Sequence, residues 1–236
     1  MWKHSIFTKN LHLTKPFFKN AGVKQPKYGK VMQNLFCDAF DFVFRHPKQG
    51  CFPPILEEMK QGGIFLAAHY GNHELLGFRL AESGLPLNAA AQEQKPKFFE
   101  RWLQKKRTFN GKCFAKKIDT GHLIDFIDGG GLFGLLADQN YKKPLPRTIK
   151  EKCESKFLGI KVRCNPLPAF ILEHRPKTPV FCGYLGQIKR IPAEDFYASY
   201  HLWLENLILE NPEKWYGWIH NRFAISSGTG LKDLFI

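Results

Sequence analysis

Apolar residues along the chain follow two patterns: short continuous runs, and positions that recur every three or four residues. The continuous runs predict buried strands at 64–69, 132–137 and 180–185, and weaker runs predict strands at 87–92 and 113–117. Helically spaced or capped segments predict helices at 55–61, 74–83, 96–109, 122–128, 166–174, 196–210 and 212–222. This alternation predicts an α/β fold with a mostly parallel central sheet and helices on both faces.

The N-terminal region has a different character from the rest of the chain. Residues 1–27 are basic and aromatic, and Pro16 and Pro26 interrupt any long helix, so we expect an arm that is loosely structured or lies on the surface. Apolar residues then recur with helical spacing over 28–45, which predicts an amphipathic helix. Packing against the domain is the favoured role for this helix, and lying on a bilayer is the alternative.

Length and cysteine usage bound the class of protein. A chain of 236 residues fits one globular domain, here 51–236, preceded by an N-terminal segment, 1–50, with a helix. Six scattered cysteines without a Cys-x2-Cys pair indicate reduced thiols rather than a zinc site or a disulfide framework. No segment has the uninterrupted apolar length of a membrane-spanning helix or the pattern of a signal peptide. We therefore expect any membrane contact to be made from one side only.

The net charge of +14 is concentrated in the middle of the sequence. Residues 95–163 carry 17 Lys/Arg against 7 Asp/Glu, a net charge of +10. A basic region of this size favours acidic partners: lipid phosphate groups, an anionic membrane surface, an acidic carrier protein or nucleic acid. A solvated basic face without a partner is the alternative.

Segment 69–74, with the sequence HYGNHE, is the strongest candidate for a chemical site. It follows a predicted strand and precedes a predicted helix, which is where open α/β sheets place their ligands. A histidine in this setting can act as a general base, and a nearby carboxylate can orient it and stabilise its charged form. We therefore assign His69 as the base and Glu74 as the carboxylate. The spacing alone is weak evidence, because 9 histidines and 21 acidic residues can supply such a pair by chance.

Five segments of the sequence line up with the motifs of one family. They are HYGNHE at 69–74, Arg107 with Gly111, Ala137-Asp138-Gln139, Phe157-Leu158-Gly159 with Pro166 and Pro168-Ala169, and NPEKWYGWIHNRF at 211–223. In these segments the chain resembles the bacterial lipid A biosynthesis acyltransferases (lauroyl/myristoyl acyltransferases), which are relatives of the glycerolipid acyltransferases with a His-x4-acid motif. The chain departs from the family at His73, where Trp is usual, and we expect His73 to lie behind the reacting groups or on the surface rather than to act as a second base.

The resemblance implies an acyltransferase. Such an enzyme moves a fatty acyl group from an acyl carrier protein or coenzyme A thioester to a hydroxyl of a lipid or glycolipid, such as a lipid A precursor. It uses no metal and no cofactor beyond the thioester co-substrate. The resemblance also implies a glycerolipid-acyltransferase-like fold and a peripheral place on the cytoplasmic face of the bacterial inner membrane.

The same resemblance gives further residues a role. Arg107 is expected to stabilise the negative charge that develops on the thioester oxygen, with help from Asn72 and the Gly71 backbone. Asp138 and Gln139 follow a predicted strand and should face the same cleft, as substrate-binding residues. For Asp138, an ion pair with Arg107, contact with the acceptor and a purely structural salt bridge all remain open.

Three other functions are weighed against this one. A glycerophospholipid acyltransferase would use the same chemistry, but the closing segment 211–223 favours the lipid A branch. A nucleic-acid-binding protein would explain the charge of 95–163 and its interleaved aromatic residues, but no recognised nucleic-acid-binding module accompanies them. A non-catalytic lipid-binding homologue is disfavoured by the presence of both His69 and Glu74.

Overall fold

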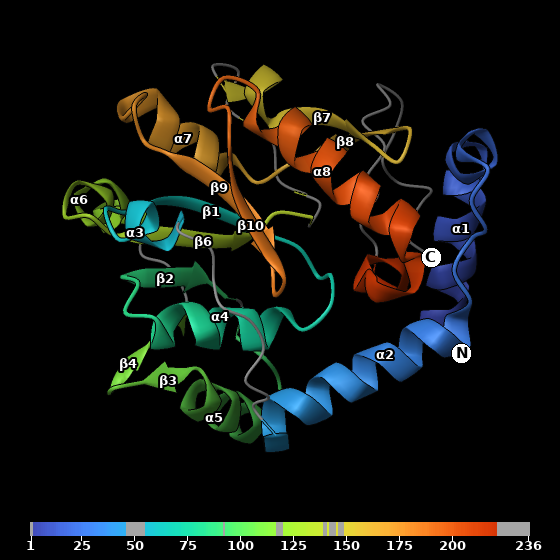
Figure 1. The fold of residues 1–236 in the computed structure, drawn as a ribbon, viewed down its shortest axis with the longest axis horizontal. Coiled ribbons are helices and arrows are strands. Elements are labelled where there is room, and N and C mark those ends of the chain that lie inside the picture. Colours follow the sequence, from blue (N-terminus) through green and yellow to red (C-terminus); the bar gives the residue numbers. More distant parts are fainter. Residues whose placement is uncertain are drawn as a thin grey trace.

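The computed structural model describes residues 2–45, 55–91, 93–116, 120–138, 141, 145 and 149–220, and shows a central sheet flanked by helices (Figure 1). The sheet has six strands, which in spatial order are β10 (Gln187–Ile191), β9 (Val180–Tyr184), β1 (Gly63–Ala67), β6 (Leu132–Leu136), β2 (Leu87–Ala90) and β5 (Ala115–Lys116). Each strand runs parallel to its neighbours, except that β10 is antiparallel to β9. The predicted α/β class with a mostly parallel sheet is confirmed.

Both faces of the sheet are buried, which explains why its central strands are continuous apolar runs. Along β1, Ile64 and Leu66 belong to one hydrophobic core, and Phe65 and Ala67 belong to a second one. Successive side chains of a strand point to opposite faces, so these two cores lie on opposite sides of the sheet. Every residue of β1 is buried.

Helices cover each of these cores. They are α3 (Ile55–Met59), α4 (His73–Glu82), α6 (Leu123–Asp128), α7 (Pro166–His174) and α8 (Phe196–Glu210). Helix α5 (Lys97–Lys106) instead contributes Leu103 to a third, small buried cluster. Buried residues of α7 and α8 belong to the larger core, and Leu76 and Leu80 of α4 belong to the smaller one. The Tyr200 hydroxyl of α8 also donates a hydrogen bond to the Ala67 carbonyl oxygen at 2.8 Å, which ties this helix to the end of β1.

The expectation of a loosely structured N-terminal arm is wrong, because residues Trp2–Ala21 form helix α1. Pro16 lies inside this helix and removes one backbone hydrogen bond. Burial of Phe7 and Phe18 in the larger core offsets that cost. The buried Asn10 amide also donates to the carbonyl oxygens of Trp218 at 2.8 Å and His220 at 2.9 Å. Tertiary contacts therefore hold a helix that local sequence preferences disfavour.

The amphipathic helix expected over residues 28–45 is present as α2 (Tyr28–Phe40), followed by a π-helical turn, Asp41–Arg45. Val31 and Phe42 are buried against the rest of the protein, as expected for a packed helix. Phe36 and Phe44 are 72% and 71% exposed, however, so this helix has a second, unburied apolar surface.

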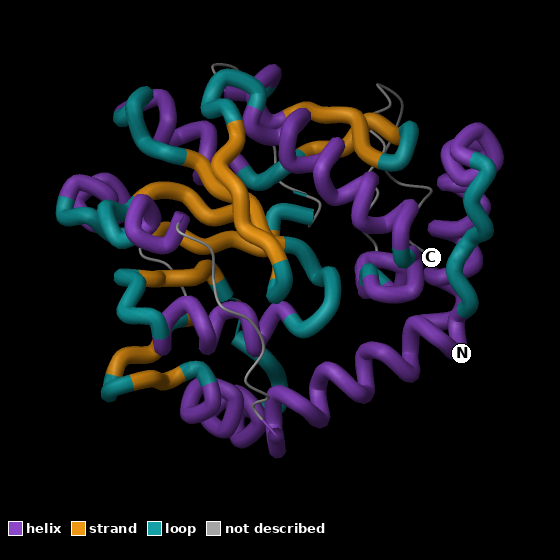
Figure 2. Tube along the Cα trace, viewed as in Figure 1, coloured by secondary structure: helices purple, strands orange, loops and turns teal. Residues whose placement is uncertain are grey.

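Short strands that lie outside the continuous apolar runs were not predicted from the sequence. β10 is one, and the hairpin of β7 (Glu154–Phe157) and β8 (Ile160–Arg163) is another, which lies beyond the central sheet in Figure 2. Its two-residue turn has positive φ at Leu158 and Gly159, as a tight hairpin requires. Two further short strands, β3 (Thr108–Phe109) and β4 (Lys112–Cys113), pair antiparallel.

The helix predicted at 212–222 is replaced, within the described residues, by two short 3₁₀ turns, Pro212–Lys214 and Tyr216–Ile219. Two other 3₁₀ turns, Thr120–His122 and Glu151–Cys153, precede α6 and β7. In the part of the chain that the structure describes, no helix combines the length and the apolar character needed to cross a membrane.

Candidate active site

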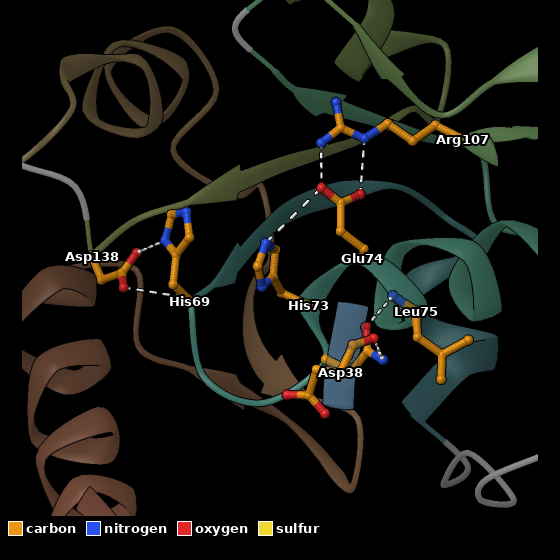
Figure 3. Close-up of polar contacts among 8 residues, drawn as sticks. Asp38, His69, His73, Glu74, Leu75, Arg107 and Asp138 are labelled. Carbon is orange, nitrogen blue, oxygen red and sulfur yellow. Dashed lines mark hydrogen bonds and ion pairs between the residues drawn. The ribbon is translucent and has the colours of Figure 1, made fainter. Parts of the chain in front are cut away.

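The site is built at the carboxyl ends of two neighbouring strands, β1 and β6. The two strands run parallel with Ala67 opposite Leu136, so the residues that follow them emerge side by side. The Nδ1 atom of His69 lies 2.8 Å from Oδ1 of Asp138, and the His69 backbone N–H donates to Oδ2 of Asp138 at 3.0 Å (Figure 3). The sheet topology therefore pairs His69 with Asp138, 69 residues away.

The Asp138 carboxylate is itself fixed by the C-terminal part of the chain. Its side chain is fully buried, and the indole N–H of Trp215 donates to Oδ2 at 2.8 Å. An ionised carboxylate accepts hydrogen bonds only, so Nδ1 of His69 must carry the proton that the two share. The other ring nitrogen, Nε2, is then left as a proton acceptor, which is the tautomer that a general base requires.

The assignment of Glu74 as the carboxylate that orients His69 is therefore corrected: Asp138 has that position. Glu74 forms a two-point ion pair with Arg107, in which Nε donates to Oε2 at 2.8 Å and Nη2 donates to Oε1 (Figure 3). The physical reason is the place of Glu74 in the fold. Glu74 lies in the first turn of α4 and Arg107 ends α5, and the two side chains meet beside the cavity rather than behind the imidazole.

The ion pair is largely buried, with 23% of the Glu74 side chain and 11% of the Arg107 side chain exposed. Burial opposes ionisation of Glu74, but hydrogen bonds and charge from Arg107 outweigh it, so the pKa of Glu74 lies below its usual 4.5. Burial likewise opposes the charge of Arg107, and Glu74 outweighs it, so the pKa of Arg107 is raised. Nη1 of Arg107 is buried and has no hydrogen-bond partner among the described residues.

Replacing Glu74 by Gln is expected to lower the free energy of unfolding by about 2 kcal/mol at pH 7, because it leaves the Arg107 charge buried and unpaired. The folded-state pKa of Glu74 is depressed, so its contribution is complete above 4.5 and is lost as the pH falls through the lower folded value. Urea unfolding of wild type and E74Q at pH 7 and at progressively lower pH measures this. A stability difference that grows on acidification would contradict the assignment.

His73 lies in the wall of the site rather than on the surface. Its ring centroid is 4.8 Å from that of His69, and its Nε2 is 4.0 Å from Oε1 of Glu74. Burial and the neighbouring His69 lower the pKa of His73 to about 4, against the opposing effect of Glu74. His73 is therefore neutral at pH 7, and of the two positions expected for it the structure shows the one beside the site, not the surface.

Asn72 and Gly71 have roles in local structure. The Asn72 side chain caps α4, because Oδ1 accepts the Leu75 N–H at 3.0 Å and Nδ2 donates to the Asp38 carbonyl at 2.7 Å. The Gly71 N–H donates to the Lys214 carbonyl at 2.9 Å, and its φ of +58° is readily adopted only by glycine. Both residues also line the cavity, and their help in stabilising a thioester oxygen stays a prediction.

A cavity of about 800 Å³ opens beside His69. His69, His73, Glu74 and Arg107 line its polar part. The rest is mainly apolar and includes Phe65, Leu76, Leu80, Leu87, Leu103 and Phe114, which belong to or adjoin β1, α4, β2, α5 and β4. Ligand sites typically combine a few convergent polar groups with a largely apolar wall of this size.

Further residues contribute to the site, and for two of them, Trp215 and His220, the sequence predicts a structural or a substrate-lining role, with the structural role favoured. Trp215 supports Asp138, and the imidazole of His220 lies 5.9 Å from that of His69, centroid to centroid. The Tyr216 hydroxyl bonds to the Asp38 carboxylate, whose pKa is raised by burial, and both residues line the cavity. The closing motif at 211–223 was the available signal, since three of these residues belong to it. Gln139 and the end of this motif lie outside the described residues.

The arrangement has no metal site among the described residues, since no three His, Cys, Asp or Glu side chains there converge to hold an ion. Comparison of the sequence with protein-family models and with curated proteins gave no match.

Proposed function

We propose that the protein is an acyltransferase that moves a fatty acyl group from a thioester to a hydroxyl of a lipid or glycolipid acceptor. One observation carries the proposal: a histidine oriented by a buried carboxylate lies at the polar end of a large apolar cavity. The histidine supplies a base for hydroxyl activation, and the cavity supplies a dry space for a hydrocarbon chain.

The reaction follows from the positions of the side chains. Nε2 of His69 accepts the proton of the acceptor hydroxyl as its oxygen attacks the thioester carbonyl carbon, and Asp138 stabilises the imidazolium that forms. When the tetrahedral intermediate collapses, the carbon–sulfur bond breaks and the imidazolium returns its proton to the leaving thiolate. Arg107 is a candidate donor to the oxyanion, because it lines the cavity and its buried Nη1 has no hydrogen-bond partner among the described residues.

The nature of donor and acceptor is proposed from the motifs. The resemblance to lipid A biosynthesis acyltransferases favours an acyl carrier protein or coenzyme A thioester as donor and a lipid A-type glycolipid as acceptor. The net charge of +10 over 95–163 suits an acidic carrier and the phosphate groups of such lipids. On this proposal the enzyme works as a peripheral protein on the cytoplasmic face of the bacterial inner membrane.

The test is transfer of a labelled acyl chain from acyl carrier protein or coenzyme A thioesters to total bacterial lipid extracts, with products identified by mass spectrometry. A glycolipid product supports the proposal as stated. Acylation of lysophosphatidate instead would place the enzyme among glycerophospholipid acyltransferases. No enzyme-dependent acylated lipid with either donor would overturn the proposal.

The cavity gives a prediction about chain length. Ala90 lines it from β2, so Ala90→Phe should narrow it and shift the preference toward shorter donors. A methylene that no longer fits is expected to cost about tenfold or more in kcat/KM. A donor series of stepwise increasing chain length measures this, with Ala198→Phe at an exposed position of α8 as the matched control. An unchanged chain-length profile in Ala90→Phe would show that the acyl chain lies elsewhere.

A further inference from the structure

The C-terminal end of α2, the following π-helical turn and helix α5 form one continuous side of the molecule, along the lower edge of Figure 1. The Lys106 ammonium of α5 donates to the Val43 carbonyl oxygen at 2.9 Å. Beneath them, Phe42 of the turn and Leu103 of α5 belong to a small buried cluster with Leu75. Elements far apart in the sequence are thus fixed side by side.

This side exposes most of the large apolar side chains that are accessible on the described surface. Of seven such residues, six belong to these elements and only Leu202 lies elsewhere. The six, called here the aromatic rim, are Phe36, Phe40, Phe44, Phe98, Phe99 and Trp102. Phe36 and Phe98 are 72% and 73% exposed, and large exposed apolar patches on soluble proteins mark interaction sites.

Exposed cations accompany the aromatic rim. Lys95 and Lys97 lie at the start of α5, and Arg101 and Lys105 lie one and two turns further on. Residues three and four apart share a helix face, so Phe98, Arg101, Trp102 and Lys105 form one stripe of alternating aromatic and cationic side chains. An interfacial helix has this composition, with rings for the acyl boundary and cations for the headgroups.

The aromatic rim also adjoins the cavity. Phe99 and Trp102 line it from α5, and Phe42 and Val43 line it from the π-helical turn. A surface held against the rim would therefore lie next to the wall of the cavity that contains His69.

We propose that the aromatic rim and the cations of α5 dock the protein on an anionic bilayer, with the cavity beside the membrane. The inference deepens the proposed function, because it names the surface by which the enzyme would reach a lipid acceptor. A second copy of the chain is disfavoured as occupant, since two such cationic faces repel each other. An acidic protein partner would complement the cations, but rings exposed over α2, the π-helical turn and α5 suit insertion into a lipid interface.

The experiment is co-sedimentation of the full chain with vesicles of phosphatidylcholine alone or mixed with phosphatidylglycerol. Phe36→Ser and Phe98→Ser are each expected to weaken binding to the mixed vesicles about tenfold, and the double variant is expected to weaken it further. Leu202→Ser, at the 61% exposed position on α8, is the matched control and should bind as wild type. None of these side chains lines the cavity, so the fold and the site are left intact.

The contribution of the α5 cations to vesicle binding is tested separately. Arg101→Glu with Lys105→Glu should weaken binding to anionic vesicles by at least about 25-fold, at roughly fivefold for each charge removed, and higher salt should weaken wild-type binding. Lys177→Glu with Lys189→Glu, two exposed positions near β9 and β10, is the control with the same change in net charge. If both double variants weakened vesicle binding equally, overall net charge would explain the binding, and the proposed docking surface would be overturned.

The outcomes separate this inference from the proposed reaction. His69→Ala should bind vesicles as wild type does, so inactivity of every preparation would defeat the reaction and leave the docking surface standing. Wild-type protein that fails to bind anionic vesicles, or rim variants that bind them normally, would overturn the docking surface. Normal vesicle binding combined with a raised KM for acyl carrier protein in the Arg101/Lys105 variant would assign the surface to the carrier instead.

Discussion

His69→Ala is expected to lower acyl transfer by about 10³-fold or more, because the acceptor hydroxyl then has no base. The loss should appear in kcat, with little change in KM for the thioester, since the imidazole stabilises the transition state rather than the bound donor. Single-turnover transfer from a saturating labelled thioester to the lipid acceptor measures it.

Two comparisons make this result specific. The His69 side chain is only 13% exposed and bonds to Asp138, so thermal unfolding of the variant must be recorded beside its activity. His122→Ala, at a side chain that is 78% exposed, is the matched control and should retain full activity. Turnover of a folded His69→Ala protein within a few-fold of wild type would show that another group is the base.

The elements that could be predicted from the sequence are those whose own residues determine them. β1, β6 and β9 are covered on both faces, so nearly every side chain is apolar and the strands appear as continuous runs. The ranges predicted for α7 and α8 agree with the structure, because each is long enough to show helical spacing between clear breaks.

Helix α1 could not be predicted in this way, because remote residues stabilise it. Pro16 disfavours a helix locally. Asn10 stabilises the helix through hydrogen bonds to Trp218 and His220, which lie more than 200 positions away in sequence. The short antiparallel strand β10 was missed for a related reason. Only two of its five residues are buried, so it has no continuous apolar run.

In the candidate site, likewise, one residue could be predicted from the sequence and its partner could not. His69 follows a strand and precedes a helix, and both are visible in the sequence, so the position of the base could be predicted. Its carboxylate could not be chosen correctly, because that choice depends on β6 lying beside β1 in the sheet. Glu74 was favoured because it is near His69 in sequence, although the fold turns it toward Arg107.

Asp138→Asn distinguishes the two carboxylates most sharply, and it is expected to lower kcat by about 10³-fold or more while the protein stays folded. The amide oxygen can replace Oδ2 and still accept from the His69 N–H and the Trp215 indole. The amide nitrogen then replaces Oδ1 and donates to Nδ1 of His69. That reversal moves the imidazole proton to Nε2, so the ring can no longer accept a proton from the acceptor.

Glu74→Gln provides the comparison, because it should cost stability more than chemistry. We expect its kcat to fall far less than that of Asp138→Asn, since it weakens the placement of Arg107 but leaves the His69 tautomer unchanged. Activity and urea unfolding measured on both variants test the order directly. A larger loss of kcat in Glu74→Gln than in Asp138→Asn, at equal stability, would contradict this order. Glu74 would then be the residue that acts with His69, and Asp138 would have a structural role only.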